Sequence, residues 1–459
     1  MGITSRLASF VVDTTFSDIP GNVVLMSKQM MLNSAAAGLA AAGEAAVDTT
    51  IQLVEEMGGK PECTIMGRGI RSSSLYAALA NGVMMDLPDY EGAVRRRVSA
   101  SSRVVSPAAM ALGERMAVPG REVLLAFALG CEVSTKVGAA GDLDELIRPR
   151  MVDYGWHLAA VVGVIGAAAA AGKLLGLGQN EMESALGIAV SQASGLQMNA
   201  GSAVTPFENG KAAMNGIMAA ILAQKGLAGA PNAIETKYGF FDCYRRDKNV
   251  DEDEFFRALA NPYDVIDPGM LLKFYPCGSH TATAVEATLH LKEQHNITPE
   301  QVQSVRAAVV EPHGGTLIRA PETGLEGKKS IKYCMAVSLV HGRPRLHHFT
   351  DEAVHDPKVR AVMDRITWEA TEQPTKEVPS PSAVTITLDS GQEVSHRAKY
   401  EKGHPGNPLT QQELDGKFAE CSRNKLSLDH IKEAIDRFHH LDELPDVAPL
   451  IALLGGTKK

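Results

Sequence analysis

The chain has 459 residues, enough for two or three domains and a large buried core. It carries 45 Lys and Arg against 54 Asp and Glu, a formal net charge of -9, so no nucleic-acid partner is expected, because such proteins usually present a basic face. Its six cysteines form no CxxC pair and no histidine lies at metal-ligand spacing, which argues against a zinc or iron–sulfur site and suits a cytoplasmic location.

The first part of the chain, residues 1–266, is helical in character. Apolar residues recur at three- and four-residue spacing, alanine is abundant, and alternating β-branched runs are scarce. The segment 158–177 is almost wholly apolar, but alanine and glycine dominate it, and it has neither an aromatic belt nor a basic flank. We therefore predict a buried central helix there, and we expect no membrane as a partner.

The pattern changes near Asp267-Pro268-Gly269 and becomes mixed over residues 267–404. The predicted helices of this part lie at about 281–294, 329–340 and 356–366, and the predicted strands at 302–310, 383–388 and 393–398. Residues 405–459 are helical again and are expected to pack back onto the first part. The predicted fold class is mainly α, with a large all-helical domain built from both chain ends and a smaller α+β domain.

One turn of the second domain carries reactive groups close together. Lys273, Tyr275 and His280 supply a cation, a phenol and an imidazole within a few residues. These groups are suited to holding a carboxylate and moving a proton. Such turns are common by chance, so the interpretation depends on the rest of the chain.

Several segments together resemble one known family. They are Asn81-Gly82, Leu186 to Gly195, Lys273 to Cys277, Ser330 to Val337 and Gly403 to Thr410. In this order and at these separations the chain resembles the MmgE/PrpD family, which includes 2-methylcitrate dehydratases, cis-aconitate decarboxylases and iminodisuccinate epimerases. The resemblance implies that the α+β domain is a lid, that the protein is a homodimer, and that it needs no cofactor. It also implies a small-molecule polycarboxylate substrate that loses a proton next to a carboxylate.

The match to the family's acidic motif and to the histidine after it is partial. In Asp89-Tyr90-Glu91-Gly92, Asp89 keeps the first carboxylate of the motif, Glu91 replaces the second, and Gly92 lacks the third. The family's His-Pro-Ser segment falls on Ala100-Ser101-Ser102, so that histidine is absent here.

The later motifs keep one imidazole and lose a cation. Gly155-Trp156-His157 matches the family pattern, which makes His157 the best remaining imidazole. The family lysine that follows becomes Thr205, and the histidine three residues later becomes Glu208. Lys211 lies about one and a half helical turns beyond Thr205 and is a candidate to compensate.

The candidate site residues follow from these matches. Arg71 resembles an arginine of epimerase-like members, and an arginine of the 95–103 stretch can hold a carboxylate in bidentate fashion. Each candidate also has a structural interpretation, as a helix cap, a core side chain or a solvated charge. The catalytic candidates are His157, Lys273, Asp89 and Tyr333, and the substrate-binding candidates are Arg71, Arg97, Arg103, Tyr275, His280 and Lys211.

The function expected from the resemblance is that of a cofactor-independent lyase, a hydro-lyase like 2-methylcitrate dehydratase, acting on a small di- or tricarboxylate. Three alternatives stay open: an epimerase or isomerase, a decarboxylase of a related polycarboxylate, and a non-catalytic paralogue. The substitutions at Ala100, Thr205 and Glu208 support the last alternative.

Overall fold

The computed structural model describes residues 2–94, 102–139, 151–245, 250–311, 320–375, 378 and 380–456. It divides into two compact units: unit 1 comprises Met1–Leu272 and Thr410–Lys459, and unit 2 comprises Lys273–Leu409. Both boundaries lie a few residues beyond the positions 266 and 404 expected from composition. The first boundary is displaced because β4 (Met270–Leu271) pairs with β3 (Ala93–Val94) inside unit 1.

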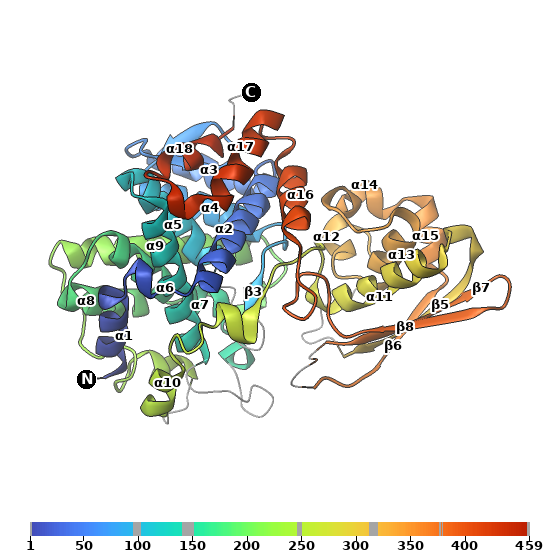
Figure 1. Ribbon diagram of the computed structural model, residues 1–459, viewed down its shortest axis with the longest axis horizontal. Helices are drawn as coiled ribbons and strands as arrows, with labels where there is room; N and C mark the ends of the chain where they lie inside the picture. Colours follow the sequence, from blue (N-terminus) through green and yellow to red (C-terminus); the bar gives the residue numbers. More distant parts are fainter. Residues whose placement is uncertain are drawn as a thin grey trace. The chain divides into compact units, whose positions relative to one another are not determined.

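Unit 1 is built mainly from helices, and both ends of the chain contribute to it (Figure 1). Its longer helices are α1 (Ile3–Asp13), α2 (Gly21–Ala41), α3 (Ala45–Met57), α4 (Ser74–Asp86), α5 (Ser102–Met116), α6 (Gly120–Ala139), α7 (Leu158–Leu174), α8 (Gln179–Val190), α9 (Val204–Gln224), α10 (Glu252–Ala258), α16 (Gln411–Ser422), α17 (Leu428–His439) and α18 (Ala448–Leu453). Besides the β3–β4 pair, β1 (Cys63–Ile65) and β2 (Ile70–Ser72) form a short antiparallel pair. The mainly α prediction is confirmed, although the term all-helical omitted these two strand pairs.

Helix α7 forms the centre of unit 1, as the apolar segment 158–177 predicted. Every residue of α7 except Lys173 is buried, and the helix packs against α5, α6 and α9. A Cβ added to Gly216 of α9 would lie 2.4 Å from the Cβ of Ala167, so small side chains allow the two backbones to approach closely. Within the described part of the chain, no helix is both long and apolar enough to cross a membrane.

Unit 2 contains a four-stranded sheet in the order β6-β5-β7-β8. Its strands are β5 (Val302–Val310), β6 (Ile366–Glu372), β7 (Ser382–Leu388) and β8 (Glu393–Ala398). Strand β5 runs parallel to β6 and antiparallel to β7, which in turn runs antiparallel to β8. The strands predicted at 302–310, 383–388 and 393–398 are confirmed, whereas β6 was missed.

The helices of unit 2 lie over one face of this sheet (Figure 1). They are α11 (Ser279–His295), α12 (Gly324–Gly327), α13 (Ile331–His341), α14 (Asp351–Val354) and α15 (Pro357–Met363). Along β7 the side chains of Ser382, Val384 and Ile386 are buried, in the alternation expected for a sheet with one covered face. The helix predicted over 356–366 is shorter than expected, because α15 ends at Met363 and the chain enters β6 at Ile366.

Candidate functional site

In unit 1, His157 and Glu208 form a hydrogen-bonded pair of reactive side chains. His157 is the residue before the first turn of α7, and its backbone N–H donates to Gly195 O at 3.1 Å. Its ring Nδ1 lies 2.6 Å from Oε2 of Glu208, which is on the first half of α9. The two side chains are 14% and 6% exposed, so the pair is mostly shielded while the imidazole keeps some contact with solvent.

The rest of the Glu208 carboxylate is also occupied. Its Oε1 accepts hydrogen bonds from the backbone N–H of Leu196 at 2.9 Å and from Asn199 Nδ2 at 3.2 Å. Because an ionised carboxylate only accepts hydrogen bonds, Nδ1 of His157 is assigned as the donor, and the lone pair of the neutral ring then lies on Nε2. Among the described residues, Nε2 has no hydrogen-bond partner. The pair is therefore arranged to take up or release a proton at Nε2.

A cation contacts the loop that passes over this pair. Lys211 follows Glu208 on α9, and its ammonium donates to Ser194 Oγ at 2.7 Å. The next residue, Gly195, has a φ of +151°, and a Cβ there would lie only 3.2 Å from Glu208 Oε2 and from His157 Cβ. Glycine thus lets the loop that contacts Lys211 pass directly over the histidine–carboxylate pair.

An aromatic group supports the same loop from another side. Trp156 lies 4.7 Å from Tyr244, ring centroid to centroid, and pairs with Leu196 in an isolated antiparallel bridge. The Tyr244 hydroxyl donates to Ala193 O, and burial raises the pKa of this phenol. Tyr244 was not predicted as part of the site, since nothing in its local sequence distinguishes it from a core aromatic residue.

The acidic motif forms a second cluster in unit 1. Asp89 is half-buried and has a left-handed backbone with φ +52°. Arg103 pairs with Asp86 at the end of α4, and its other terminal nitrogen donates to Gly92 O at 3.2 Å. Burial alone would lower the pKa of Arg103, but Asp86, Glu91 and Asp89 together raise it. Arg103 thus holds the loop that carries Asp89. These contacts favour a structural role for Arg103.

Glu91, the substitute for the second family carboxylate, is buried in a network of hydroxyl groups. Its Oε2 accepts from Gly92 N at 2.6 Å and from Ser102 Oγ at 2.7 Å, and its Oε1 accepts from Ser34 Oγ. The residue is 1% exposed. Its contacts are those of a structural carboxylate that anchors the loop.

Arg71 is engaged by its own hairpin and by Glu114 of α5. Its Nη1 donates to buried Glu114 at 2.8 Å and to Thr64 Oγ1 at 3.2 Å, while the other nitrogens donate to the backbone carbonyls of Pro61 and Glu62. This placement favours a structural ion pair over a free anion clamp. Arg97, the remaining arginine candidate, lies outside the described residues.

In unit 2, both candidate tyrosines have hydroxyl groups that bond within the unit. Tyr275 is 4% exposed and donates to Glu286 Oε2 at 2.6 Å, and burial together with this carboxylate raises the pKa of its phenol. Tyr333 is fully buried on α13, donates to the backbone oxygen of His348, and also has its pKa raised by burial. These contacts favour packing roles for both residues.

The other two unit 2 candidates are near the start of α11. Lys273 Nζ donates to Cys277 O at 3.2 Å, which closes the turn on itself. His280 Nε2 lies 3.0 Å from Lys329 O, so the ring bonds to the segment before α13. Both side chains are partly exposed. Their assignments to catalysis and substrate binding stay predictions.

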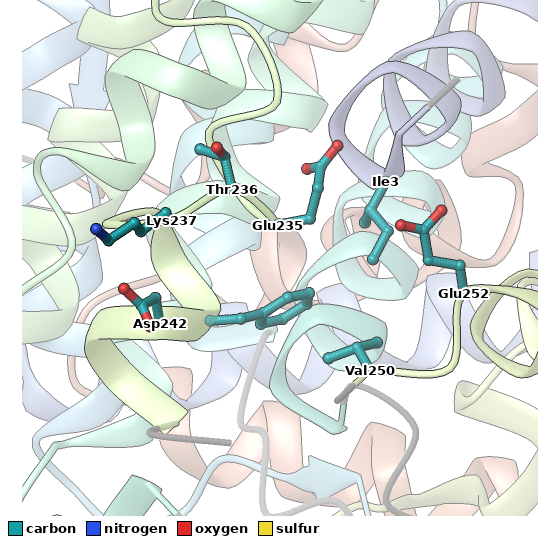
Figure 2. A pocket seen from close by; sticks show the side chains of 8 residues that line it. Ile3, Glu235, Thr236, Lys237, Asp242, Val250 and Glu252 are labelled. Carbon is teal, nitrogen blue, oxygen red and sulfur yellow. The ribbon is translucent and has the colours of Figure 1, made fainter. Parts of the chain in front are cut away.

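A separate cavity of about 240 Å³ lies beside the first turn of α1 (Figure 2). Glu235 Oε2 accepts from Thr4 N at 3.1 Å and from Thr4 Oγ1 at 2.6 Å, so this carboxylate satisfies the N-terminal turn of α1. None of the candidate site residues lines the cavity. Its lining residues are Ile3, Glu235, Thr236, Lys237, Phe241, Asp242, Val250 and Glu252.

Comparison with known proteins gives the family. Residues 5–253 match the model of the MmgE/PrpD N-terminal domain, and residues 275–441 match that of the MmgE/PrpD C-terminal domain. The chain is 27% identical to the cis-aconitate decarboxylase of Homo sapiens and 26% identical to that of Mus musculus, with 99% of this chain covered in both cases and 95% and 93% of those proteins. It is 26% identical to the 2-methylcitrate dehydratase of Cupriavidus necator over 52% of each chain. The chain therefore belongs to the MmgE/PrpD family, whose named relatives here are enzymes.

Proposed function

We propose that this protein is a cofactor-independent lyase that acts on a small di- or tricarboxylate by proton transfer at a carbon next to a carboxylate. The observation that carries the proposal is the His157–Glu208 pair, with 2.6 Å between Nδ1 and Oε2. A carboxylate that accepts a hydrogen bond from Nδ1 of an imidazole fixes the ring orientation and the tautomer and leaves Nε2 to react, as in other acid–base pairs of enzymes.

His157 performs the proton transfer in this scheme. Nε2 takes a proton from the carbon beside the carboxylate, and the electron pair of the broken C–H bond moves into an enolate. In a dehydration this electron pair forms the new C=C bond while hydroxide leaves from the neighbouring carbon and is protonated to water. Clustered donors and cations stabilise the negative charge that develops on the enolate.

Lys211 is the cation that we assign to this stabilisation. It lies on the same helix as Glu208 and bonds to Ser194, in the loop that crosses the pair. The position at which the family has a lysine is Thr205, whose hydroxyl donates to Asn199 O at 2.7 Å and so serves the loop instead. In our proposal Lys211 replaces the missing charge, and Asp89 orients the substrate or protonates the leaving group.

Decarboxylation is the second candidate, and the comparisons favour testing it. Relatives that match this chain over 99% of its length include named cis-aconitate decarboxylases, whereas the named 2-methylcitrate dehydratase of Cupriavidus necator matches over 52%. In that reaction a C–C bond breaks, CO₂ leaves, and the remaining electron pair is protonated. For this step the His157 ring must start doubly protonated, as the imidazolium, and its Nε2–H then donates the proton from the same position. We also propose a homodimer, which analytical ultracentrifugation of the purified protein would test.

The proposal is tested by proton NMR of the purified protein in D₂O with citrate-, methylcitrate-, aconitate- and aspartate-derived polycarboxylates. We expect deuterium uptake at a carbon beside a carboxylate, and its loss in His157→Ala. New alkene signals together with released water or CO₂ identify a lyase, whereas uptake with inversion and no alkene identifies an epimerase. Absence of exchange and of product across the panel would refute the proposal.

A further inference from the structure

The C-terminal part of the chain places a buried lysine against the acidic motif. Lys417 of α16 is 0% exposed, and its ammonium donates to Asn33 Oδ1 at 2.7 Å and to Tyr90 O at 2.6 Å. The same nitrogen lies 3.7 Å from the centroid of the Tyr90 ring, which is within the range of a cation–π contact. A single cation thus holds both the backbone and the side chain of Tyr90.

Stability alone is a poor explanation for a lysine at this place. Transfer of an ammonium group from water into a protein interior is costly, and whole buried ion pairs can often be replaced by apolar side chains of similar volume without loss of stability. A methionine would fill the same space between α2 and α16 without that cost. What it cannot supply is a pair of directed hydrogen bonds to Asn33 and to the carbonyl of Tyr90.

Tyr90 follows Asp89 in the chain, and the backbone of Asp89 has a positive φ. Asp89 has φ +52°, a left-handed conformation that is uncommon for residues other than glycine, although Asp and Asn adopt it more readily than most. Such a conformation persists where the surrounding structure fixes it, and it is enriched at functional sites. Here Asp89 N donates to Asp86 O at 3.0 Å on one side, and Lys417 holds Tyr90 on the other.

We propose that Lys417 is a positioning residue, which holds Asp89 in the orientation required for the reaction by fixing Tyr90. The inference rests on the proposed function, because Asp89 takes part in the reaction only there. It gives the C-terminal helices a role in the active site in addition to packing.

The first test measures the loop directly and needs no substrate. Lys417→Met is compared with Lys432→Met, a matched change at an exposed lysine of α17, by hydrogen–deuterium exchange of peptides that cover residues 86–92. We expect exchange in this loop to become about 5-fold faster or more in Lys417→Met and to stay unchanged in Lys432→Met. Unchanged exchange in folded Lys417→Met would overturn the inference. If that variant does not fold, Tyr90→Leu takes its place. It removes the cation–π contact and keeps the hydrogen bond from Lys417 to the carbonyl, so we expect a smaller increase in exchange of the same loop, and unchanged exchange would overturn the inference.

The second test is a double-mutant cycle with Asp89→Asn. We expect Lys417→Met to lower kcat/KM by about 10-fold in the wild-type background and by less than about 3-fold in the Asp89→Asn background, since Lys417 then has nothing left to position. Equal losses in both backgrounds would show that Lys417 acts on the structure as a whole and would overturn the inference. If the wild-type protein turned over no polycarboxylate, the proposed function and the positioning role of Lys417 in the reaction would both be refuted. The exchange measurement would still decide whether Lys417 holds the loop.

Discussion

Replacing Glu208 by glutamine removes the carboxylate charge beside His157 and nearly preserves the shape of the side chain. In the structure Oε2 lies 2.6 Å from Nδ1, and the two side chains are 14% and 6% exposed. A hydrogen bond to a charged group at such a site contributes about 1.5–3 kcal/mol. Full loss of that contribution in the transition state corresponds to a fall of about 10- to 150-fold in kcat/KM. The amide can also present either its oxygen or its NH₂ group to Nδ1, so the tautomer is no longer fixed.

The assay for this variant is kcat/KM with the polycarboxylate that the wild-type protein uses, together with the rate of proton exchange in D₂O. Glu56→Gln, an exposed position on α3, is the matched control and should keep the wild-type rate. Circular dichroism and the thermal unfolding midpoint show whether Glu208→Gln is folded. A folded Glu208→Gln protein with the wild-type rate would refute the assignment of the pair to proton transfer.

Three further predictions follow from other contacts. Lys211→Met should lower kcat/KM by about 10-fold or more, because a cation beside the enolate is lost. The exposed Lys225, which follows the last residue of α9, is the matched control, and Lys225→Met should keep the wild-type rate. Equal rates for the two variants would contradict the role of Lys211. Lys136→Met should lower the free energy of unfolding of unit 1 by about 3–5 kcal/mol, because it leaves the buried Asp264 carboxylate, 2.7 Å from Lys136 Nζ, without its cation. Urea unfolding measures this, and a loss below about 1 kcal/mol, as for an exposed ion pair, would contradict it. Burial and two neighbouring histidines lower the pKa of His348 to about 4. Below pH 6.5 the unfolded state therefore binds a proton that the folded state does not. The free energy of unfolding of unit 2 should fall by about 1–2 kcal/mol as the pH falls from 6.5 to 4. Urea unfolding at several pH values checks this, and a His348→Asn variant with an unchanged pH profile would contradict it.

The sequence by itself determined the features that repeat along the chain. The three- and four-residue spacing of apolar positions indicated the helices of unit 1, and the alternation at 383–388 indicated β7, because a helix or strand with one buried face imposes its own period on the sequence. Strand β6 was missed because its pairing is non-local: Val305 of β5 pairs with Ile366, and no short-range pattern shows that contact. The family match extended this local information to the order of the domains.

The tertiary structure decided which side chains meet. In the sequence, Glu208 is only a position where a family histidine is absent, yet the fold brings it to His157, 51 residues earlier in the chain. Lys417 likewise lies 327 residues from Tyr90 and gives no local sign of a role near the acidic motif. Hydrogen bonds of this kind depend on how α7, α9 and α16 pack, and packing is set by the whole core of unit 1 and not by the residues next to each partner. The sequence therefore identified the reactive residue types, and only the fold paired them.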